Sequence, residues 1–206
     1  MKSRAGKVFA SVAVALLLAL AGMTLRSAGQ VPVTLPSFTG GELPFPWSGG
    51  LNAGQFCALD LDLDGSDDLV LFDRHGNRAV PFLFRPSVAG GYAEAPGYAP
   101  LLPVMHDWLI TADYDDDGRK DIFTYGLGGI RVFRNISTDT LTFRNVTDLL
   151  ESFYYTGKVG ILVTSVDYPA IGDIDGDGDL DLLTFFGLGS YVEFHKNLSV
   201  EKYGTP

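Results

Sequence analysis

The chain has 206 residues, of which 46% are hydrophobic and 19% are charged, and its formal net charge is −10. This acidity argues against nucleic-acid binding, which needs a basic surface to meet the phosphates. The single cysteine, Cys57, cannot form an intramolecular disulfide and is expected in the core, where free cysteine is readily buried.

The N-terminus has the order of a secretory signal peptide. Basic residues in the first seven positions precede an apolar run from Val8 to Ala21, and small residues follow at Ser27–Gly29. A comfortable membrane span needs about 20 apolar residues, and this run is shorter. We therefore expect cleavage near Gly29, a mature chain without a membrane span, and a secreted location, extracellular or at the cell surface. The alternative is an uncleaved membrane anchor.

Aspartates gather in three segments of identical spacing, residues 60–68, 113–121 and 173–181. In each, aspartate occupies positions 1, 3, 5 and 9, and glycine occupies position 6. Fifteen of the 25 acidic residues lie in these segments. Removal of residues 1–29 would leave a net charge of −14, so nearly all of the excess negative charge is local. Within one segment the like charges repel one another unless a cation binds.

This spacing predicts a site for a hard divalent cation. Calcium takes six to eight oxygen ligands at about 2.3–2.6 Å, which a short loop supplies if alternate side chains turn inward. Glycine at position 6 permits the sharp turn that brings a later carbonyl and the fourth carboxylate to the ion. The three segments therefore predict up to three Ca²⁺ ions.

An EF-hand does not account for these loops. It requires a bidentate glutamate at position 12 and a helix on either side, whereas position 12 is Leu71, Thr124 or Thr184. The flanks are short apolar runs rich in β-branched and aromatic residues, such as Leu69–Phe72 and Ile122–Tyr125, which is typical of strands. We predict that each loop joins one strand to the next.

The loops begin 53 and then 60 residues apart, a period typical of stacked repeats. Residues 122–135 and 182–197 both run from a strand through a Gly-Leu-Gly turn into a second strand, and both end on asparagine. Residues 69–84 are expected to form a hairpin with His-Gly-Asn in its turn. A further strand candidate follows, for example residues 141–146, which gives about four strands per repeat, the content of a β-propeller blade.

The pattern Asp-x-Asp-x-Asp-Gly-x-x-Asp, with an aromatic-Gly pair after the next strand, resembles the FG-GAP/VCBS repeats of integrin-like β-propellers in secreted bacterial proteins. Tyr125-Gly126 and Phe186-Gly187 match that pair, and Phe72-Asp73 departs from it. The resemblance covers residues 44–206. It implies an all-β fold in which an aspartate loop links the first two strands of each blade and binds calcium.

The ligands that the resemblance implies are the side chains at positions 1, 3, 5 and 9 and the backbone carbonyl at position 7: Asp60, Asp62, Asp64, Asp68 and Ser66 in the first loop; Asp113, Asp115, Asp117, Asp121 and Arg119 in the second; Asp173, Asp175, Asp177, Asp181 and Asp179 in the third. Arg119 and Lys120 bring positive charge to the second loop, and we expect its binding to be the weakest.

The repeats divide the chain into five segments: a signal peptide (1–29), a segment leading into the first repeat (30–51), and three repeats (52–107, 108–167 and 168–206). Closed propellers have about four to eight blades, so three repeats predict an incomplete propeller. We expect further blades from a longer chain, or an open arc of three blades whose exposed edge binds a partner.

No catalytic pattern accompanies the loops. His75, His106 and His195 have no metal-ligand spacing, and the sequence contains no Gly-x-Ser-x-Gly elbow and no P-loop. We expect a non-enzymatic scaffold for extracellular binding or adhesion to a protein or glycan, with mainly structural calcium. Residues 152–156 are an aromatic stretch that could contact such a ligand. The alternative is the propeller part of a carbohydrate-active enzyme, a polysaccharide lyase or hydrolase, with catalytic residues outside this chain.

Overall fold

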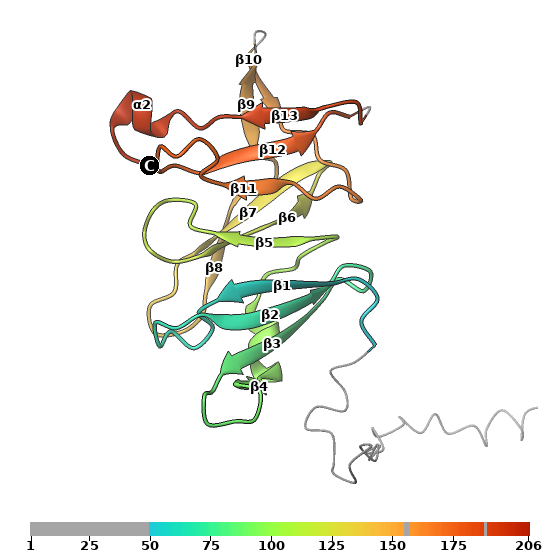
Figure 1. Ribbon diagram of the computed structural model, residues 1–206, viewed down its shortest axis with the longest axis vertical. Coiled ribbons are helices and arrows are strands. Elements are labelled where there is room, and N and C mark those ends of the chain that lie inside the picture. Colours follow the sequence, from blue (N-terminus) through green and yellow to red (C-terminus); the bar gives the residue numbers. More distant parts are fainter. Residues whose placement is uncertain (1–49, 155–156, 188) are drawn as a thin grey trace, which may run out of the picture. The chain divides into compact units, whose positions relative to one another are not determined.

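The computed structural model describes residues 50–154, 157–187 and 189–206, which belong to one unit, Trp47–Pro206 (Figure 1). The predicted signal peptide and most of segment 30–51 lie outside the described residues. Within the described ranges, the regular structure is antiparallel β-sheet apart from two short helices, η1 (Pro96–Leu101) and α2 (Ser199–Tyr203). Neither helix has the length or the apolar character to cross a membrane.

The first two repeats form equivalent four-stranded sheets, in the orders β1-β2-β3-β4 and β5-β6-β7-β8. The strands of the first sheet are β1 (Gly54–Leu59), β2 (Asp68–Asp73), β3 (Arg78–Phe84) and β4 (Tyr92–Glu94). The strands of the second are β5 (Leu109–Ala112), β6 (Asp121–Gly126), β7 (Gly129–Asn135) and β8 (Phe143–Thr147). Each strand is antiparallel to the next, so the prediction of four-stranded antiparallel repeats is confirmed.

The third repeat forms a sheet of order β11-β12-β13 in the described residues. Its strands are β11 (Ala170–Gly172), β12 (Asp181–Phe185) and β13 (Val192–His195). A separate hairpin of β9 (Glu151–Tyr154) and β10 (Gly157–Gly160) precedes this sheet and extends away from it (Figure 1). The predicted aromatic stretch 152–156 therefore lies largely on the first strand of a hairpin.

A tight turn between β6 and β7 fixes the register of the second sheet. Gly126 pairs with Gly129, and the two residues between them, Leu127 and Gly128, have φ angles of 49° and 80°. Two consecutive residues with positive φ make a type I′ turn, which matches the right-handed twist of paired strands. The Gly-Leu-Gly sequence therefore forms the hairpin that the repeat pattern predicts.

Apolar side chains alternate along the strands and form two cores between the sheets. The first core joins the first and second sheets and includes Leu59, Val70, Phe72, Leu109 and Ile122. The second core joins the second and third sheets and includes Trp108, Phe123, Ile130, Val132 and, from the third sheet, Leu182. Each sheet thus packs face against face with the next, as stacked repeats require.

The first strands of neighbouring sheets lie side by side. The N–H of Leu109 on β5 donates to the side-chain oxygen of Gln55 on β1 at 2.9 Å, and the hydroxyl of Thr111 donates to the carbonyl of Ala58 at 2.9 Å. Cys57 is buried at the same junction, as predicted, and burial raises the pKa of its thiol to about 11. Closure of the sheets into a propeller ring is not detected among the described residues.

Candidate metal centres

Each aspartate loop joins the first two strands of its sheet. The first loop runs between β1 and β2, the second between β5 and β6, and the third between β11 and β12 (Figure 1). Strands flank every loop, as predicted, where an EF-hand would have helices.

The aspartate at position 1 organises the backbone of its loop. The Asp60 carboxylate accepts hydrogen bonds from the N–H groups of Asp64 at 3.1 Å and Gly65 at 2.9 Å. Asp113 accepts the equivalent bonds from Asp117 and Gly118, and Asp173 accepts the N–H groups of Gly176 and Gly178, all at 2.7–3.1 Å. The glycines at position 6 have φ between 84° and 102°, a conformation that residues with a side chain disfavour. Aspartate and glycine together therefore set the curvature of each loop.

The aspartate at position 9 connects its loop to the third strand of the sheet. Asp121 opens β6, where one carboxylate oxygen accepts the N–H of Tyr114 at 2.7 Å and the other accepts the N–H of Asn135 at 2.6 Å. Asp68 and Asp181 make the same two bonds, at 2.7–3.2 Å. All three side chains are buried, with exposed fractions of 0–2%. This carboxylate is therefore held in place from two sides.

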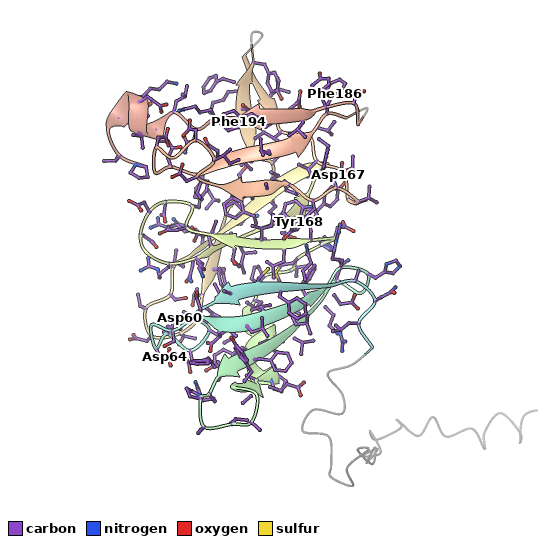
Figure 2. The ribbon with its side chains drawn as sticks, viewed as in Figure 1. Asp60, Asp64, Asp167, Tyr168, Phe186 and Phe194 are labelled. Carbon is purple, nitrogen blue, oxygen red and sulfur yellow. The ribbon has the colours of Figure 1, made fainter. Side chains whose placement is uncertain are left out.

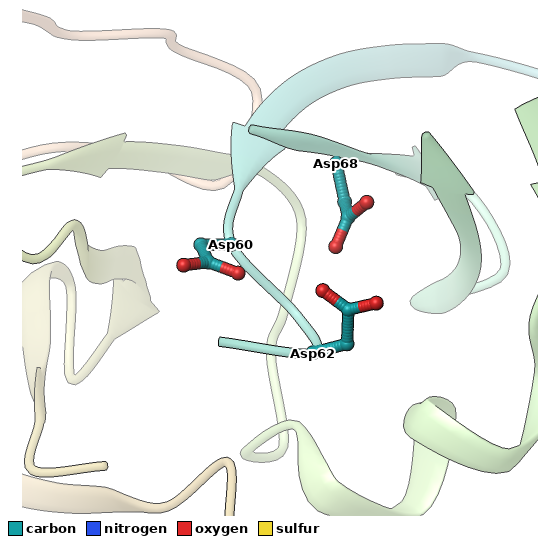
Figure 3. A group of neighbouring side chains, drawn as sticks. All are labelled: Asp60, Asp62 and Asp68. Carbon is teal, nitrogen blue, oxygen red and sulfur yellow. The ribbon is translucent and has the colours of Figure 1, made fainter. Parts of the chain in front are cut away.

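The carboxylates at positions 1, 3 and 9 converge in every loop. Ligand oxygens lie within 4.8 Å of one another in each of three groups: Asp60, Asp62 and Asp68; Asp113, Asp115 and Asp121; Asp173, Asp175 and Asp181. Figure 3 shows the first group, in which the Asp60, Asp62 and Asp68 carboxylates face a common space. One oxygen of Asp62 and one of Asp115 are buried without a hydrogen-bond partner.

The donor set suits a hard cation. All side-chain donors in the three groups are carboxylate oxygens, which hard divalent ions prefer over nitrogen and sulfur ligands. Burial raises the pKa of Asp121 to about 6 and also raises that of Asp68, although backbone N–H groups act in the opposite direction. A bound cation would favour the ionised form of these buried carboxyl groups. The residues present therefore fit a divalent metal ion.

The aspartates at position 5 lie outside these groups. Asp64, Asp117 and Asp177 each accept the N–H of the residue two positions later, at 2.8–3.1 Å. Those donors are Ser66, Arg119 and Asp179, the residues predicted to offer their carbonyls. The loop thus turns at positions 5–7, and three of its four predicted aspartate side chains converge. The side chain of Asp179 is also buried, and it accepts the N–H of Val200 on α2 at 3.1 Å.

A basic side chain from the end of the third strand reaches each loop. Arg85 pairs with Asp62 at 2.6 Å, Arg134 pairs with Asp117 at 3.1 Å, and Lys196 pairs with Asp177 at 3.0 Å. Hydrogen bonding to the carboxylates raises the pKa of all three basic groups. The sequence reasoning missed these residues, although Arg134-Asn135 and Lys196-Asn197 occupy matching positions in the two related segments.

Residues 113–184, from the second loop to β12, match the family model described as an FG-GAP-like repeat. This segment is an FG-GAP-like repeat. No curated protein and no solved structure matches the chain. The FG-GAP-like segment contains the whole second and third loops, and the first loop, which precedes it, has the same three converging carboxylates.

Proposed function

We propose that the chain is a calcium-binding repeat module in which up to three Ca²⁺ ions each join the first two strands of a sheet. The observation that carries this proposal is the convergence of three carboxylates in every loop, with buried oxygens of Asp62 and Asp115 lacking a hydrogen-bond partner. Buried polar atoms are almost always paired, so these two call for a ligand.

The ion's role in this proposal is structural. The position 9 carboxylate already accepts bonds from its own loop and from the third strand, so an ion bound there would link the loop to three strands at once. An ion that binds the folded chain stabilises it in proportion to its occupancy. We expect dissociation constants of about 10⁻⁴–10⁻³ M, the range of extracellular calcium modules.

Calorimetric titration of the chelator-treated protein with CaCl₂ tests the proposal directly. Heat from up to three sites and a rise in melting temperature are expected. Asp62→Asn should remove part of the heat, whereas Asp139→Asn, an exposed aspartate outside the loops, serves as the matched control. Absence of calcium heat together with an unchanged melting temperature on chelation would refute calcium binding.

We further propose that the module is a non-enzymatic scaffold for extracellular binding, exported through the signal peptide predicted at residues 1–29. Two features support a ligand-binding role. The β9–β10 hairpin carries Phe153, which is 74% exposed, with the ammonium groups of Lys158 and Lys202 at 5.3 and 5.8 Å from its ring centre. A cavity of about 590 Å³ lies beside it, within the range of ligand sites.

The third sheet and the turn that follows β12 carry further aromatic side chains. Figure 2 shows Phe194 on β13 and Phe186 just after β12, and the Phe186 ring stacks on Tyr191 with centres 4.5 Å apart. Tyr191 and Phe194 are exposed, and exposed aromatic groups are enriched where proteins bind partners. Calcium-dependent retention on glycans or cells, lost in Phe153→Ala, is the expected result. Degradation of the polysaccharide by the protein alone would instead favour the carbohydrate-active enzyme.

A further inference from the structure

The three loops have similar acidic residues but different basic neighbours. In the second loop, Arg134 from β7 pairs with both Asp115 and Asp117, and Arg119 pairs with Asp117 as well. The Arg119 Nε group also donates to the carbonyl of Asn135 at 3.3 Å, which keeps this guanidinium beside the loop. Two permanent positive charges therefore lie at the second loop, because arginine does not lose its proton in proteins.

The first loop has one basic side chain at its converging carboxylates. Among the carboxylates of this loop Arg85 pairs with Asp62, through one oxygen, while the other oxygen of Asp62 is the buried atom without a partner. Lys120 reaches the first loop from the second, but it pairs at 2.6 Å with Asp67, which is not one of the converging carboxylates. The first loop therefore keeps more of its negative charge than the second.

In the third loop the single basic side chain is offset by an additional acid. Lys196 pairs with Asp175 and Asp177, and it also pairs with Glu201 on helix α2. Glu201, Asp175 and Asp177 form a further acidic group around this ammonium. The buried carboxyl of Asp179 lies in the same loop and has no counterpart in the first two, where position 7 is Ser66 or Arg119. The third loop is therefore the most negative of the three.

From this distribution we infer that the neighbouring basic side chains set the order of calcium affinities, with the third loop strongest, the first intermediate and the second weakest. Arg134 and Arg119 both weaken the second loop, whereas Arg85 is the one arginine at the converging carboxylates of the first. This inference rests on the proposed calcium binding. A cation repels a second cation in inverse proportion to their distance, and partly buried charges are screened less than exposed ones. Because Arg134 is only about one-third exposed, its effect on an ion at Asp115 should persist at physiological salt.

Asp62 and Asp115 pair with Arg85 and Arg134 in the same way, which shows how an arginine can affect an ion in its loop. In both loops the position 3 carboxylate uses Oδ2 for an arginine and leaves Oδ1 buried and unpaired. The arginine therefore leaves one oxygen of this carboxylate for the ion, and its influence on affinity is through charge rather than through obstruction. If Arg134 served instead to orient Asp115, loss of the arginine would weaken calcium binding rather than strengthen it.

Calorimetric titration with CaCl₂ on the mature chain tests the order. Asp62→Asn, Asp115→Asn and Asp175→Asn each remove one converging carboxylate from one loop. We expect Asp175→Asn to abolish the tightest binding phase and Asp115→Asn to abolish the weakest. Any other assignment of the phases overturns the order of affinities.

The role of Arg134 is tested in the Asp62→Asn, Asp175→Asn double variant, in which the second loop is the remaining intact site. Adding Arg134→Gln should lower the dissociation constant about tenfold, which corresponds to about 1.4 kcal/mol. Arg131→Gln is the matched control, because Arg131 lies on the same strand and pairs with Asp148 at 2.9 Å, away from the loop. An unchanged or weaker affinity in Arg134→Gln refutes the inference.

Two results separate this inference from the proposed function. If the unmodified chain binds no calcium, calcium binding itself fails; if it binds calcium at three sites of equal affinity, only the inference fails. Circular dichroism should show intact sheet structure in every variant. If Arg134→Gln does not fold, Arg119→Gln removes the other positive charge at Asp117 and must likewise tighten binding for the inference to stand.

Discussion

Replacement of Asp121 by alanine tests whether the position 9 aspartate supports its sheet even without metal. This side chain is fully buried and accepts the N–H of Tyr114 at 2.7 Å and the N–H of Asn135 at 2.6 Å. Alanine would leave both N–H groups without an acceptor at the junction of the loop, β6 and β7. The variant should therefore be destabilised in the presence of a chelator as well as in calcium.

The expected loss follows from the two bonds. A buried donor left without a partner costs about 1–3 kcal/mol, so two cost about 2–6 kcal/mol. Removal of a buried carboxyl group offsets part of this loss, because burial already disfavours its charge and raises its pKa to about 6. We expect a net loss of about 3 kcal/mol, or about 6–12 °C in melting temperature for a chain of this size.

Thermal and urea unfolding followed by circular dichroism, in excess chelator, would measure this loss. Asp139→Ala is the control, since Asp139 is exposed and should change the free energy of unfolding by less than about 0.5 kcal/mol. The free energy of unfolding of Asp121→Asn should lie between those of Asp121→Ala and Asp139→Ala, because the amide oxygen still accepts one N–H but the NH₂ group faces the other. A loss below about 1 kcal/mol for Asp121→Ala would contradict the reasoning, since even one unpaired buried donor should cost that much.

Three further predictions concern other parts of the chain. A Cβ at Gly129 would lie 2.4 Å from the carbonyl oxygen of Ile161, so Gly129→Ala should cost about 1–3 kcal/mol in urea unfolding, whereas Gly97→Ala, with open space around it, should not. Burial lowers the pKa of His195 below its usual 6.5, so its contribution to stability is present above pH 6.5 and is lost as pH falls through the lower folded-state pKa. The fall in melting temperature between pH 7.5 and 5.5 should therefore be smaller in His195→Gln than in the unmodified chain. An equal fall in the two proteins would show that another group is responsible. Cys57 should resist alkylation in the native protein and react on unfolding, because burial keeps its thiol protonated; rapid labelling of the folded chain would contradict its placement in the core.

The loops and their flanking strands could be predicted because their signals are local. Position 12 excludes the EF-hand, glycine at position 6 marks the turn, and the Gly-Leu-Gly sequence marks the hairpin after β6. Each of these features depends on neighbours a few residues away. The family match over residues 113–184 confirms the resemblance that these local motifs carried.

The parts that could not be predicted depend on contacts between distant residues. Arg134 reaches the second loop only because β7 pairs with β6, and Glu201 reaches the third loop only because α2 lies beside Lys196. His195, for which the sequence shows no metal-ligand spacing, lies on edge strand β13 and is buried, with its ring nitrogen 3.1 Å from the hydroxyl of Thr184. Residue type alone does not reveal which side chains meet across strands.

The bonds from Asp68, Asp121 and Asp181 to the third strands have a consequence for assembly. A slip of β7 by one residue against β6 would move the Asn135 N–H by about 3.3 Å, beyond the reach of Asp121, and would turn every side chain of β7 to the opposite face. Asp121 would then lose one of the two bonds that hold its carboxylate beside Asp113 and Asp115, so an ion would bind best to chains in which the hairpin has already paired correctly. The three repeats share similar strands, and repeat proteins are prone to misfold by pairing strands of different repeats. Preferential binding of the ion to correctly paired hairpins would oppose this misfolding.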